Sequence, residues 1–322
     1  MENGKTRVGL SRRGDRRANV FGALDLVRAE VGAKVADEVM IKPNFLSSEN
    51  QLASTHADAA RGVLDFLGGL PRPPRRVVIA EGANEKYSGE SFDNFAYRRL
   101  AEEYPFELDF VDLHQETEWV ETDIFLAGRE RVPVRMPRRV LDCPCTVSLA
   151  VAKTHDVCVV TLALKNMIMG TLHKDDRIKM HGYGSHAERV LPREAQTLSI
   201  NLARVARYLC PDIGVVDATQ GLQGNGPGGT DAVEQGVAVA SADTYAADAV
   251  MAKAMGFEPL DLGWLHYAQS LGQGVSDLED IEVLETEIEA VRVAFKPHES
   301  TEKQLQWQDA EAGAYLPAAG SA

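Results

Sequence analysis

The sequence predicts an α/β protein with a mostly parallel, doubly wound sheet and an antiparallel insertion or small subdomain. Short runs rich in β-branched residues alternate with segments whose apolar residues recur at helical spacing. Several of these runs are wholly apolar, which is typical of strands buried on both faces of a parallel sheet. Residues 117–142 break the alternation with charged residues between β-forming ones, and we expect an antiparallel hairpin there.

The first half of the chain contains four predicted strands and three predicted helices. We expect the strands at residues 8–10, 39–41, 77–80 and 106–113. We expect the helices at residues 18–31, from a capping signal at 55–58 to the prolines that begin at Pro71, and at residues 91–104.

The second half continues the same pattern around two long loops. Its strands are expected at residues 146–152, 213–216 and 237–240, and its helices at residues 159–169, 192–209, 244–255 and 262–271. Gly170 should end the first of these helices and Pro192 should open the second. The loops are residues 171–191, rich in His and Lys, and residues 221–229, rich in Gly.

The C-terminal part differs in composition from the rest. Residues 277–289 contain seven acids and no base, which predicts a solvated edge strand. Residues 291–322 have low apolar periodicity, which predicts a frayed terminus. We therefore expect an α/β domain over residues 1–290, with the insertion at 117–142, followed by a C-terminal tail at 291–322.

Composition narrows the partners. The 322 residues contain 34 Lys and Arg against 48 Asp and Glu, so the formal charge is −14. Such acidity argues against nucleic acid or an anionic membrane, because phosphate neutralisation requires clustered Lys and Arg. No apolar run approaches the ~18 residues of a membrane-spanning helix. We expect a small-molecule partner, no nucleic acid and no membrane, with a homodimer as the candidate assembly.

Cysteine usage and the glycine-rich loop bear on location and cofactors. Four cysteines do not make a disulfide framework and the N-terminal segment lacks the apolar core of a signal peptide, so we expect a cytoplasmic, reducing location. Cys143 and Cys145 form a C-x-C pair, unlike an iron–sulfur run, so no iron–sulfur cluster is expected. Residues 224–229 match G-x-G-x-x-G in letters, but no predicted helix follows and Pro227 lacks an amide, so NAD is not expected. The cofactor is otherwise left open.

Polar residues follow four of the predicted strands. Ligands of open parallel sheets bind outside the carboxyl ends of the strands, because the loops that follow the strands converge there. The alternative is that strand ends are polar simply because loops are polar. The residues at these ends are Lys42 and Asn44, Glu81, Lys153 with Thr154 and His155, and Asp217.

Residues 153–189 form a cationic island in this acidic chain and hold four of its eight histidines. Clefts lined by one sign of charge concentrate ligands of the other sign, so we expect a substrate that carries a carboxylate, phosphate or phenolate. The alternative is a solvated basic loop without chemistry. The basic residues of the island are Lys153, His155, Lys165, His173, Lys174, Arg177, Lys179, His181, His186 and Arg189.

Lys165 and Asn166 interrupt an apolar segment, where a lone Lys is costly unless it is paired, faces a cleft or extends to the surface. We expect this pair to face the site. The nearby histidines, with Asp175 or Asp176, could supply metal ligands, but their spacings match no compact zinc motif and H-E-x-x-H is absent, so no metal site is predicted.

Several of these segments together resemble a known family. They are IKPN at 41–44, EG at 81–82, AKTHDVCVVTLALKN at 152–166, PDIGVVDAT at 211–219, GNGPGGT at 224–230 and ASADTYAADAVMAKAMGF at 240–257. Over about residues 36–285 the chain is similar to the family catalogued as domain of unknown function 362. The resemblance implies an α/β fold without a general activity, and many members carry a ferredoxin-like module that is expected to be missing from this stand-alone chain.

The resemblance also marks recurrent polar positions, nearly the same set as the strand ends. They are Lys42, Asn44, Glu81, Lys153, Thr154, His155, Lys165, Asn166, Asp217 and Asn225. A looser likeness to lactate-racemase-type proteins, which use His and Lys between two α/β halves, is an analogy.

The sequence therefore favours an enzyme that performs acid–base chemistry, such as isomerisation, cyclisation or elimination, on an anionic small molecule. Lys153 and His155 are the predicted acid–base pair, Lys165 the stabiliser of a developing oxyanion, and Glu81 a second base or a group that orients a Lys. Two alternatives stay open: a redox or cofactor-binding protein, and a non-catalytic binding protein for an anionic metabolite. The predicted substrate-binding residues are Lys42, Asn44, Thr154, Asn166, His173, Lys174, His181, Asp217 and Asn225.

Overall fold

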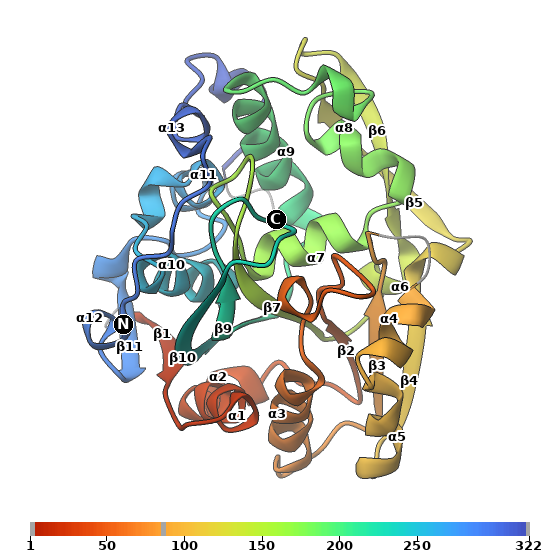
Figure 1. Cartoon of the computed structure of the whole chain (residues 1–322). Coiled ribbons are helices and arrows are strands. Elements are labelled where there is room, and N and C mark those ends of the chain that lie inside the picture. Colours follow the sequence, from red (N-terminus) through yellow and green to blue (C-terminus); the bar gives the residue numbers. More distant parts are fainter. Residues whose placement is uncertain (1–3, 85–87, 320–322) are drawn as a thin grey trace.

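The computed structural model describes residues 4–84 and 88–319. Residues 1–3 of the predicted domain and residues 320–322 of the predicted tail lie outside this part of the chain. Within it, nine strands form one sheet between two layers of helices (Figure 1). In spatial order the strands are β11 (Ile281–Glu285), β1 (Thr6–Ser11), β10 (Ala232–Ser241), β9 (Ile213–Leu222), β7 (Thr146–Thr154), β2 (Glu38–Lys42), β3 (Arg76–Glu81) and β4 (Glu107–Asp112), and β8 (Val160–Thr161) pairs with β7.

The sheet is mostly parallel, as predicted. Strands β9, β7, β2, β3 and β4 run parallel to one another, and β1 runs parallel to the acidic edge strand β11. Strand β10 runs antiparallel to both β9 and β1. The central strand β7 is buried along its whole length, which explains why its sequence carries no charge before Lys153.

Helices cover both faces of the sheet and build a separate apolar core on each. On one face lie α1 (Arg16–Leu26) and α3 (Ala57–Gly68). On the other lie α7 (Ala163–Thr171), α9 (Arg193–Leu209), α10 (Thr244–Ala254) and α11 (Gly263–Leu271). The shorter helices are α2 (Arg28–Gly32), α4 (Ser88–Asn94), α5 (Leu100–Glu103), α6 (Arg138–Leu141), α8 (Arg177–Met180), α12 (Ile288–Val291) and α13 (Thr301–Gln304).

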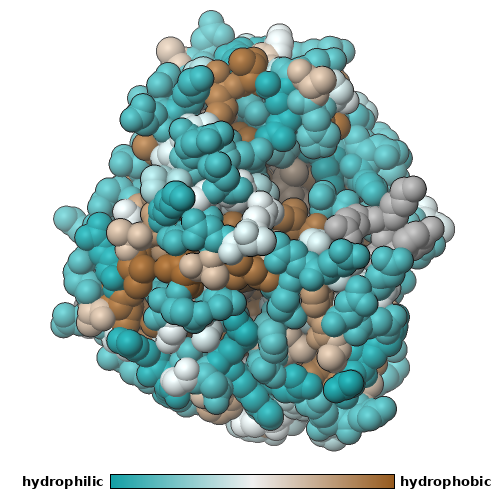
Figure 2. Space-filling model, in the orientation of Figure 1, coloured by the Kyte–Doolittle hydropathy of each residue, from teal (hydrophilic) through white to brown (hydrophobic). Residues whose placement is uncertain are grey.

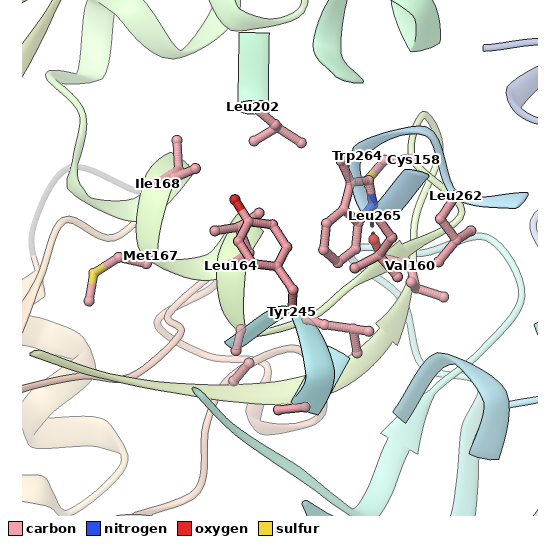
Figure 3. Close-up of a cluster of buried hydrophobic side chains, with 14 of the residues drawn as sticks. Cys158, Val160, Leu164, Met167, Ile168, Leu202, Tyr245, Leu262, Trp264 and Leu265 are labelled. Carbon is pink, nitrogen blue, oxygen red and sulfur yellow. Dashed lines mark hydrogen bonds between the residues drawn. The ribbon is translucent and has the colours of Figure 1, made fainter. Parts of the chain in front are cut away.

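Helix α7 lies in the middle of the second core. Figure 3 shows its Leu164 and Ile168 in an apolar cluster with Leu202 of α9 and Tyr245 of α10. Because residues four apart lie on one face of a helix, this cluster holds one side of α7 and leaves neighbouring positions to face elsewhere.

The order of the strands places a topological switch point between β2 and β7. From β2 the chain proceeds outward through α3 to β3 and then to β4, whereas from β7 it proceeds through α7 and α9 to β9 on the opposite side. The first connection lies on one face and the second on the other. The loops after β2 and β7 therefore separate, which leaves a crevice at their carboxyl ends.

The insertion forms a two-stranded antiparallel sheet of its own. Strand β5 (Trp119–Phe125) pairs with β6 (Arg131–Pro137), with Trp119 opposite Pro137 and Phe125 opposite Arg131. Its buried residues Ile124, Val134 and Met136 join the core on the α7 face. The antiparallel pair is thus present where the alternating charges predicted it.

Three predicted helices differ from the structure. The predicted helix at 159–169 begins later, because Val159 adopts a positive φ and Val160–Thr161 form strand β8, where β-branched residues favour extended backbone. Gly170, the predicted end of this helix, lies within α7. The predicted helix at 91–104 is broken at Ala96, whose φ is 58°. Helix α3 begins within the predicted capping segment 55–58, but its cap residue is His56 and not Thr55, which precedes it; His56 Nδ1 accepts a hydrogen bond from the Asp58 amide at 3.0 Å.

Three predicted loops and ends also differ. The loop at 171–191 contains the short helix α8, and strand β9 extends to Leu222, into the predicted glycine-rich loop. The expectation of a frayed terminus is wrong, because Phe295, Trp307 and Ala312 are buried in the α7-face core. A few large apolar side chains, spaced irregularly, suffice to hold this segment although it lacks a periodic pattern.

The surface seen in Figure 2 is mostly hydrophilic, with apolar residues grouped across its middle. None of the helices in residues 4–84 and 88–319 combines the length and the apolar composition that crossing a bilayer requires.

Candidate functional site

A cavity of about 620 Å³ opens at the carboxyl ends of β2, β3 and β7. The segment that contains α8 and residues 184–189 forms the opposite wall. The cavity therefore lies at the topological switch point, where open parallel sheets bind ligands. Eight of the predicted site residues line it: Asn44, Glu81, Lys153, His155, Lys165, Asn166, Lys174 and His181.

A buried hydrogen-bond network connects Glu81 to Lys153 beneath this cavity. Lys42 Nζ lies 2.5 Å from Glu81 Oε2 and donates to Asn166 Oδ1 at 2.9 Å. Asn44 donates from Nδ2 to the same Asn166 oxygen at 3.0 Å. Asn44 Oδ1 in turn accepts from Lys153 Nζ at 2.5 Å. In their ammonium forms the two lysines can only donate hydrogen bonds, so the side-chain amides of Asn44 and Asn166 are held with their oxygens toward the lysine nitrogens.

Lys42 and Glu81 form a closed pair. Their side chains are 0% and 2% exposed. Burial lowers the pKa of Lys42 and raises the pKa of Glu81, and their mutual attraction opposes both shifts. Gly170 of α7 makes room for this pair, since a Cβ there would lie 2.2 Å from Lys42 Nζ. Glu81 lines the cavity, whereas Lys42 is not among the lining residues.

Among residues 4–84 and 88–319, no carboxylate forms an ion pair with the buried Lys153. Its Nζ donates to Asn44 Oδ1 and, at 2.7 Å, to the carbonyl oxygen of Ala53. Burial, together with the positive charges of Lys165 and Lys42, lowers the pKa of Lys153 to about 7. The two acceptors leave one position of the tetrahedral nitrogen, which holds a proton below that pH and a lone pair above it.

A second chain of contacts runs through His155. Lys165 Nζ lies 2.6 Å from His155 Nε2, and His155 Nδ1 lies 3.0 Å from Asp156 Oδ1. Asp156 also pairs with Arg189 at 2.8 Å. His155 Nδ1 also accepts a hydrogen bond from the Val157 amide at 3.0 Å, so the imidazole is fixed by contacts at both ring nitrogens.

His155 is held neutral. Burial, together with the positive charge of Lys165, lowers its pKa to about 3, despite the attraction of Asp156. For Asp156, burial opposes ionisation, but the hydrogen bond from His155 and the charge of Arg189 outweigh it and lower the pKa. The two members of the predicted acid–base pair thus differ, because near neutral pH only Lys153 changes its protonation state.

His181 lies beside His155 on the α8 side of the cavity. The two rings stack with their centroids 6.4 Å apart. His181 Nδ1 contacts the buried Glu194 Oε1 at 2.7 Å, and Arg189 donates to the same oxygen. Burial lowers the pKa of His181, although Glu194 opposes the shift.

Arg177 belongs to the cavity wall, and the strand-end pattern did not single it out. It donates to three carbonyl oxygens: Leu172 at 3.1 Å, Ala83 at 3.2 Å and Gly170 at 3.2 Å. Burial lowers its pKa to about 10. Gly82 makes room for it, since a Cβ there would lie 2.6 Å from the guanidinium. Its only sequence signal is its membership of the cationic island.

Asp248 of α10 positions α7 from behind. Its Oδ1 accepts from the Ala163 amide at 2.7 Å and its Oδ2 from the Leu164 amide at 2.9 Å. The first amides of a helix have no acceptor within the helix, and the cap residue of α7, Leu162, has no side-chain oxygen to offer them. Asp248 takes the place of that missing cap. Burial raises the pKa of Asp248 to about 7. A lone acid within an Ala-rich segment is the signal that could have revealed it.

A family model covers most of the segments that build this site. It is described as Domain of unknown function (DUF362) and matches residues 39–253. The chain belongs to the DUF362 family. The matched range includes both ends of the hydrogen-bond network and the His155 contacts.

Two individual proteins are similar to parts of this DUF362 chain. The thylakoid-associated protein sll1697 of Synechocystis sp. is 23% identical over 139 residues, which are 43% of this chain and 41% of that protein. The lactate racemase apoprotein from Thermoanaerobacterium thermosaccharolyticum has a TM-score of 0.41 at 9% identity, over 66% of this chain and 50% of that chain. The match thus spans half or less of each protein's own length.

Other predicted substrate-binding residues of this DUF362 protein lie away from the cavity. Thr154 donates from Oγ1 to the Gly224 carbonyl at 2.9 Å, and Asn225 exchanges hydrogen bonds with Glu299 in the tail. The His173 ring packs edge-on against Trp119 of β5, with centroids 4.8 Å apart. Asp217 pairs with Arg16 at 2.6 Å on the α1 side of the sheet. These four side chains hold loops and layers together.

The glycine-rich loop and the histidines also have defined places. The loop joins two antiparallel strands, β9 and β10, and Gly226 packs so closely on Thr154 that a Cβ would lie 2.2 Å from its carbonyl oxygen. His181 and His186 line the cavity while His173 does not. Across residues 4–84 and 88–319, no three His, Cys, Asp or Glu side chains converge as metal ligands would.

Proposed function

We propose that this DUF362 protein is an enzyme that removes and returns a proton on an anionic small molecule. The observation that carries the proposal is Lys153, a buried amine with a pKa of about 7 at the wall of a cavity that also holds Lys165 and Arg177. Isomerisation, cyclisation and elimination all begin with such a proton transfer.

Lys153 is the base in this proposal. Its bonds to Asn44 and Ala53 fix the nitrogen, so the neutral amine directs its lone pair at one position. The C–H bond of the substrate breaks, the proton moves to Nζ, and the electron pair of that bond passes into an adjacent carbonyl or carboxylate group. Returning the proton to the same or another atom completes the reaction without a further reactant.

Lys165 binds the negative charge that develops. Lys165 Nζ lies 2.6 Å from His155 Nε2, and the imidazolium form of His155 is disfavoured by burial. In this proposal Lys165 is the preorganised cation that stabilises an oxyanion in a water-poor site. His155 and Asp156 act as positioning residues for this cation.

Hydrogen exchange with heavy water tests the proposal whatever the product of the reaction is. The purified protein is incubated in D₂O with 2-hydroxy and 2-oxo carboxylates, and ¹H NMR follows the loss of each C–H signal. We expect one class of anion to exchange in the wild type and the Lys153→Met variant to lose the exchange. Lys253→Met, which removes an amine from α10 outside the cavity, should retain it.

The binding-protein alternative predicts a different result from the same experiment. An anion that stays bound through gel filtration, with no exchange and no new signals in any mixture, would replace catalysis by ligand storage. Exchange that persists at the wild-type rate in Lys153→Met would assign the base to another residue.

A further inference from the structure

The charges at the cavity wall are unequally paired. Two carboxylates of this wall, Glu81 and Asp156, each have a cationic partner, Lys42 and Arg189, whereas the third carboxylate, Asp175, is 78% exposed and lies 3.8 Å from His173. By contrast, neither Lys165 nor Arg177 forms an ion pair with a carboxylate among residues 4–84 and 88–319; Glu81 and Asp112 attract Arg177 only from beyond contact distance, and the hydrogen bonds of the two cations go to an imidazole and to backbone carbonyls. A buried cation without a counter-charge is costly, and a ligand that supplies the charge relieves this cost.

The two cations stand at opposite ends of one helix. Lys165 is in the first turn of α7, and Arg177 donates to Gly170 in its last turn. Five residues separate Lys165 from Gly170, which is about 7.5 Å along a helix axis. A short chain with an acidic group at each end matches this spacing.

Arg177 also has donors to spare. A guanidinium carries five N–H groups, and the three carbonyls occupy three of them. The two others remain for an oxyanion, which guanidinium groups bind with well-defined geometry. The three carbonyls meanwhile hold the group in place before a ligand arrives.

We propose that Arg177 forms a second anion subsite and that the substrate of this site is a dianion, with one acidic group at Lys165 and the other at Arg177. The inference rests on the proposed anionic substrate of the same cavity and extends it to a substrate class. A dicarboxylate of three to six carbons is the simplest molecule of this kind. Lys153, which lies in the same wall, then faces the carbon chain between the two groups.

Calorimetric titration with matched acids tests this inference. The probes are malonate, succinate, glutarate and adipate, each compared with the monocarboxylate of equal chain length. We expect at least one diacid to bind about 10- to 100-fold more tightly than its monoacid, which is the range of one additional charge-assisted hydrogen-bonded contact. In Arg177→Gln this ratio should approach one, because only the second carboxylate loses its partner.

Lys179→Gln is the matched control. It removes one positive charge from the same short helix, where Lys179 pairs with Asp176 outside the cavity. It should keep the wild-type ratio. If Arg177→Gln fails to fold, Lys165→Gln should abolish the same preference from the other end, and the wild-type titrations are decisive by themselves.

The outcomes separate this inference from the proposed function. Equal affinity for every diacid and its monoacid, or a ratio that survives in Arg177→Gln, overturns the dianion. Deuterium exchange on a monoanion would then leave the proposed function intact. A clear diacid preference without exchange would keep the subsite and remove the catalysis.

Discussion

Two charged residues on neighbouring strands, Lys153 near the end of β7 and Asp217 in the middle of β9, show how similar sequence patterns lead to different roles. Each charged residue follows an apolar run, and each side chain is almost fully buried. Asp217 lies 2.6 Å from Arg16 of α1 and so neutralises the charge of a side chain from a helix that packs on the sheet. In the part of the chain that the structure describes, the hydrogen-bond partners of Lys153 are two neutral oxygens, and its side chain lines a cavity.

The difference between the two residues lies in the surroundings that each side chain meets next to the sheet. Asp217 points to the α1 side, where helix and sheet are in close contact and a cation closes the pair. Lys153 is at the switch point between β2 and β7, where the layers separate. A charge that follows an apolar run thus becomes a functional candidate when its counter-charge is missing and a cavity is present.

The largest expected effect comes from Lys153→Met. Removal of a general base lowers the rate of proton transfer by about 10²- to 10⁴-fold, and the unbranched Met fills the same volume. Deuterium exchange on the responsive substrate measures the rate. Asp217→Asn, measured on its folded fraction, should retain the wild-type rate, and an equal loss in both variants would remove the distinction between the two residues.

Asp217→Asn should reverse the ranking when stability is measured. It leaves Arg16 without its partner, and breaking a largely buried ion pair lowers the free energy of unfolding by about 3 kcal/mol. Urea denaturation followed by circular dichroism gives this value. Lys153→Met should be as stable as the wild type or more so, because it removes a buried amine that has no counter-charge; a larger loss than in Asp217→Asn would contradict this.

Gly170→Ala tests the packing behind the cavity. Its Cβ would lie 2.2 Å from Lys42 Nζ, so the Lys42–Glu81 pair must shift. Overpacking of this kind lowers the free energy of unfolding by about 1–3 kcal/mol, and the displaced network should also slow exchange. Gly89→Ala in α4 is the control, since nothing lies within 4 Å of its added Cβ. Equal unfolding free energies for the two variants would show that the pair tolerates the methyl group.

Measured over one pH unit, the smallest expected effect is the pH dependence of stability contributed by Lys153. Its pKa is about 7 in the folded chain and about 10.4 in an unfolded one, so between these values the unfolded state binds more protons. Stability therefore rises with pH in this window, by at most about 1.4 kcal/mol per unit, relative to Lys153→Met. Exchange should also increase through pH 7 and then level off, because the neutral amine is the base. Parallel stability curves for the two proteins would indicate an ordinary lysine.

Much of the sheet could be predicted from apolar runs alone, because strands buried on both faces exclude charge along their length. The predictions from sequence failed where the local backbone conformation or a few long-range contacts decide the structure and the hydrophobic pattern does not. Val159 adopts a φ of 67° and starts a reversal that no periodicity reveals, and the buried Trp307 holds a tail that lacks repeats. The strand-end rule placed Lys153, His155 and Glu81 near one another, but it missed Arg177, which turns back onto the end of α7 from the next short helix, and Asp248, which reaches the start of α7 from a segment distant in sequence.

The sequence by itself determined the layered α/β arrangement and the edge of the sheet on which charged residues gather, because side-chain hydrophobicity and backbone direction act locally. Only the tertiary structure decided which of those charges are paired. Asp217 meets Arg16 from 201 positions away, whereas Lys153, Lys165 and Arg177 meet neutral groups around a shared cavity. Pairing depends on distances between distant segments, and it separates charges that hold the fold together from charges available to a ligand.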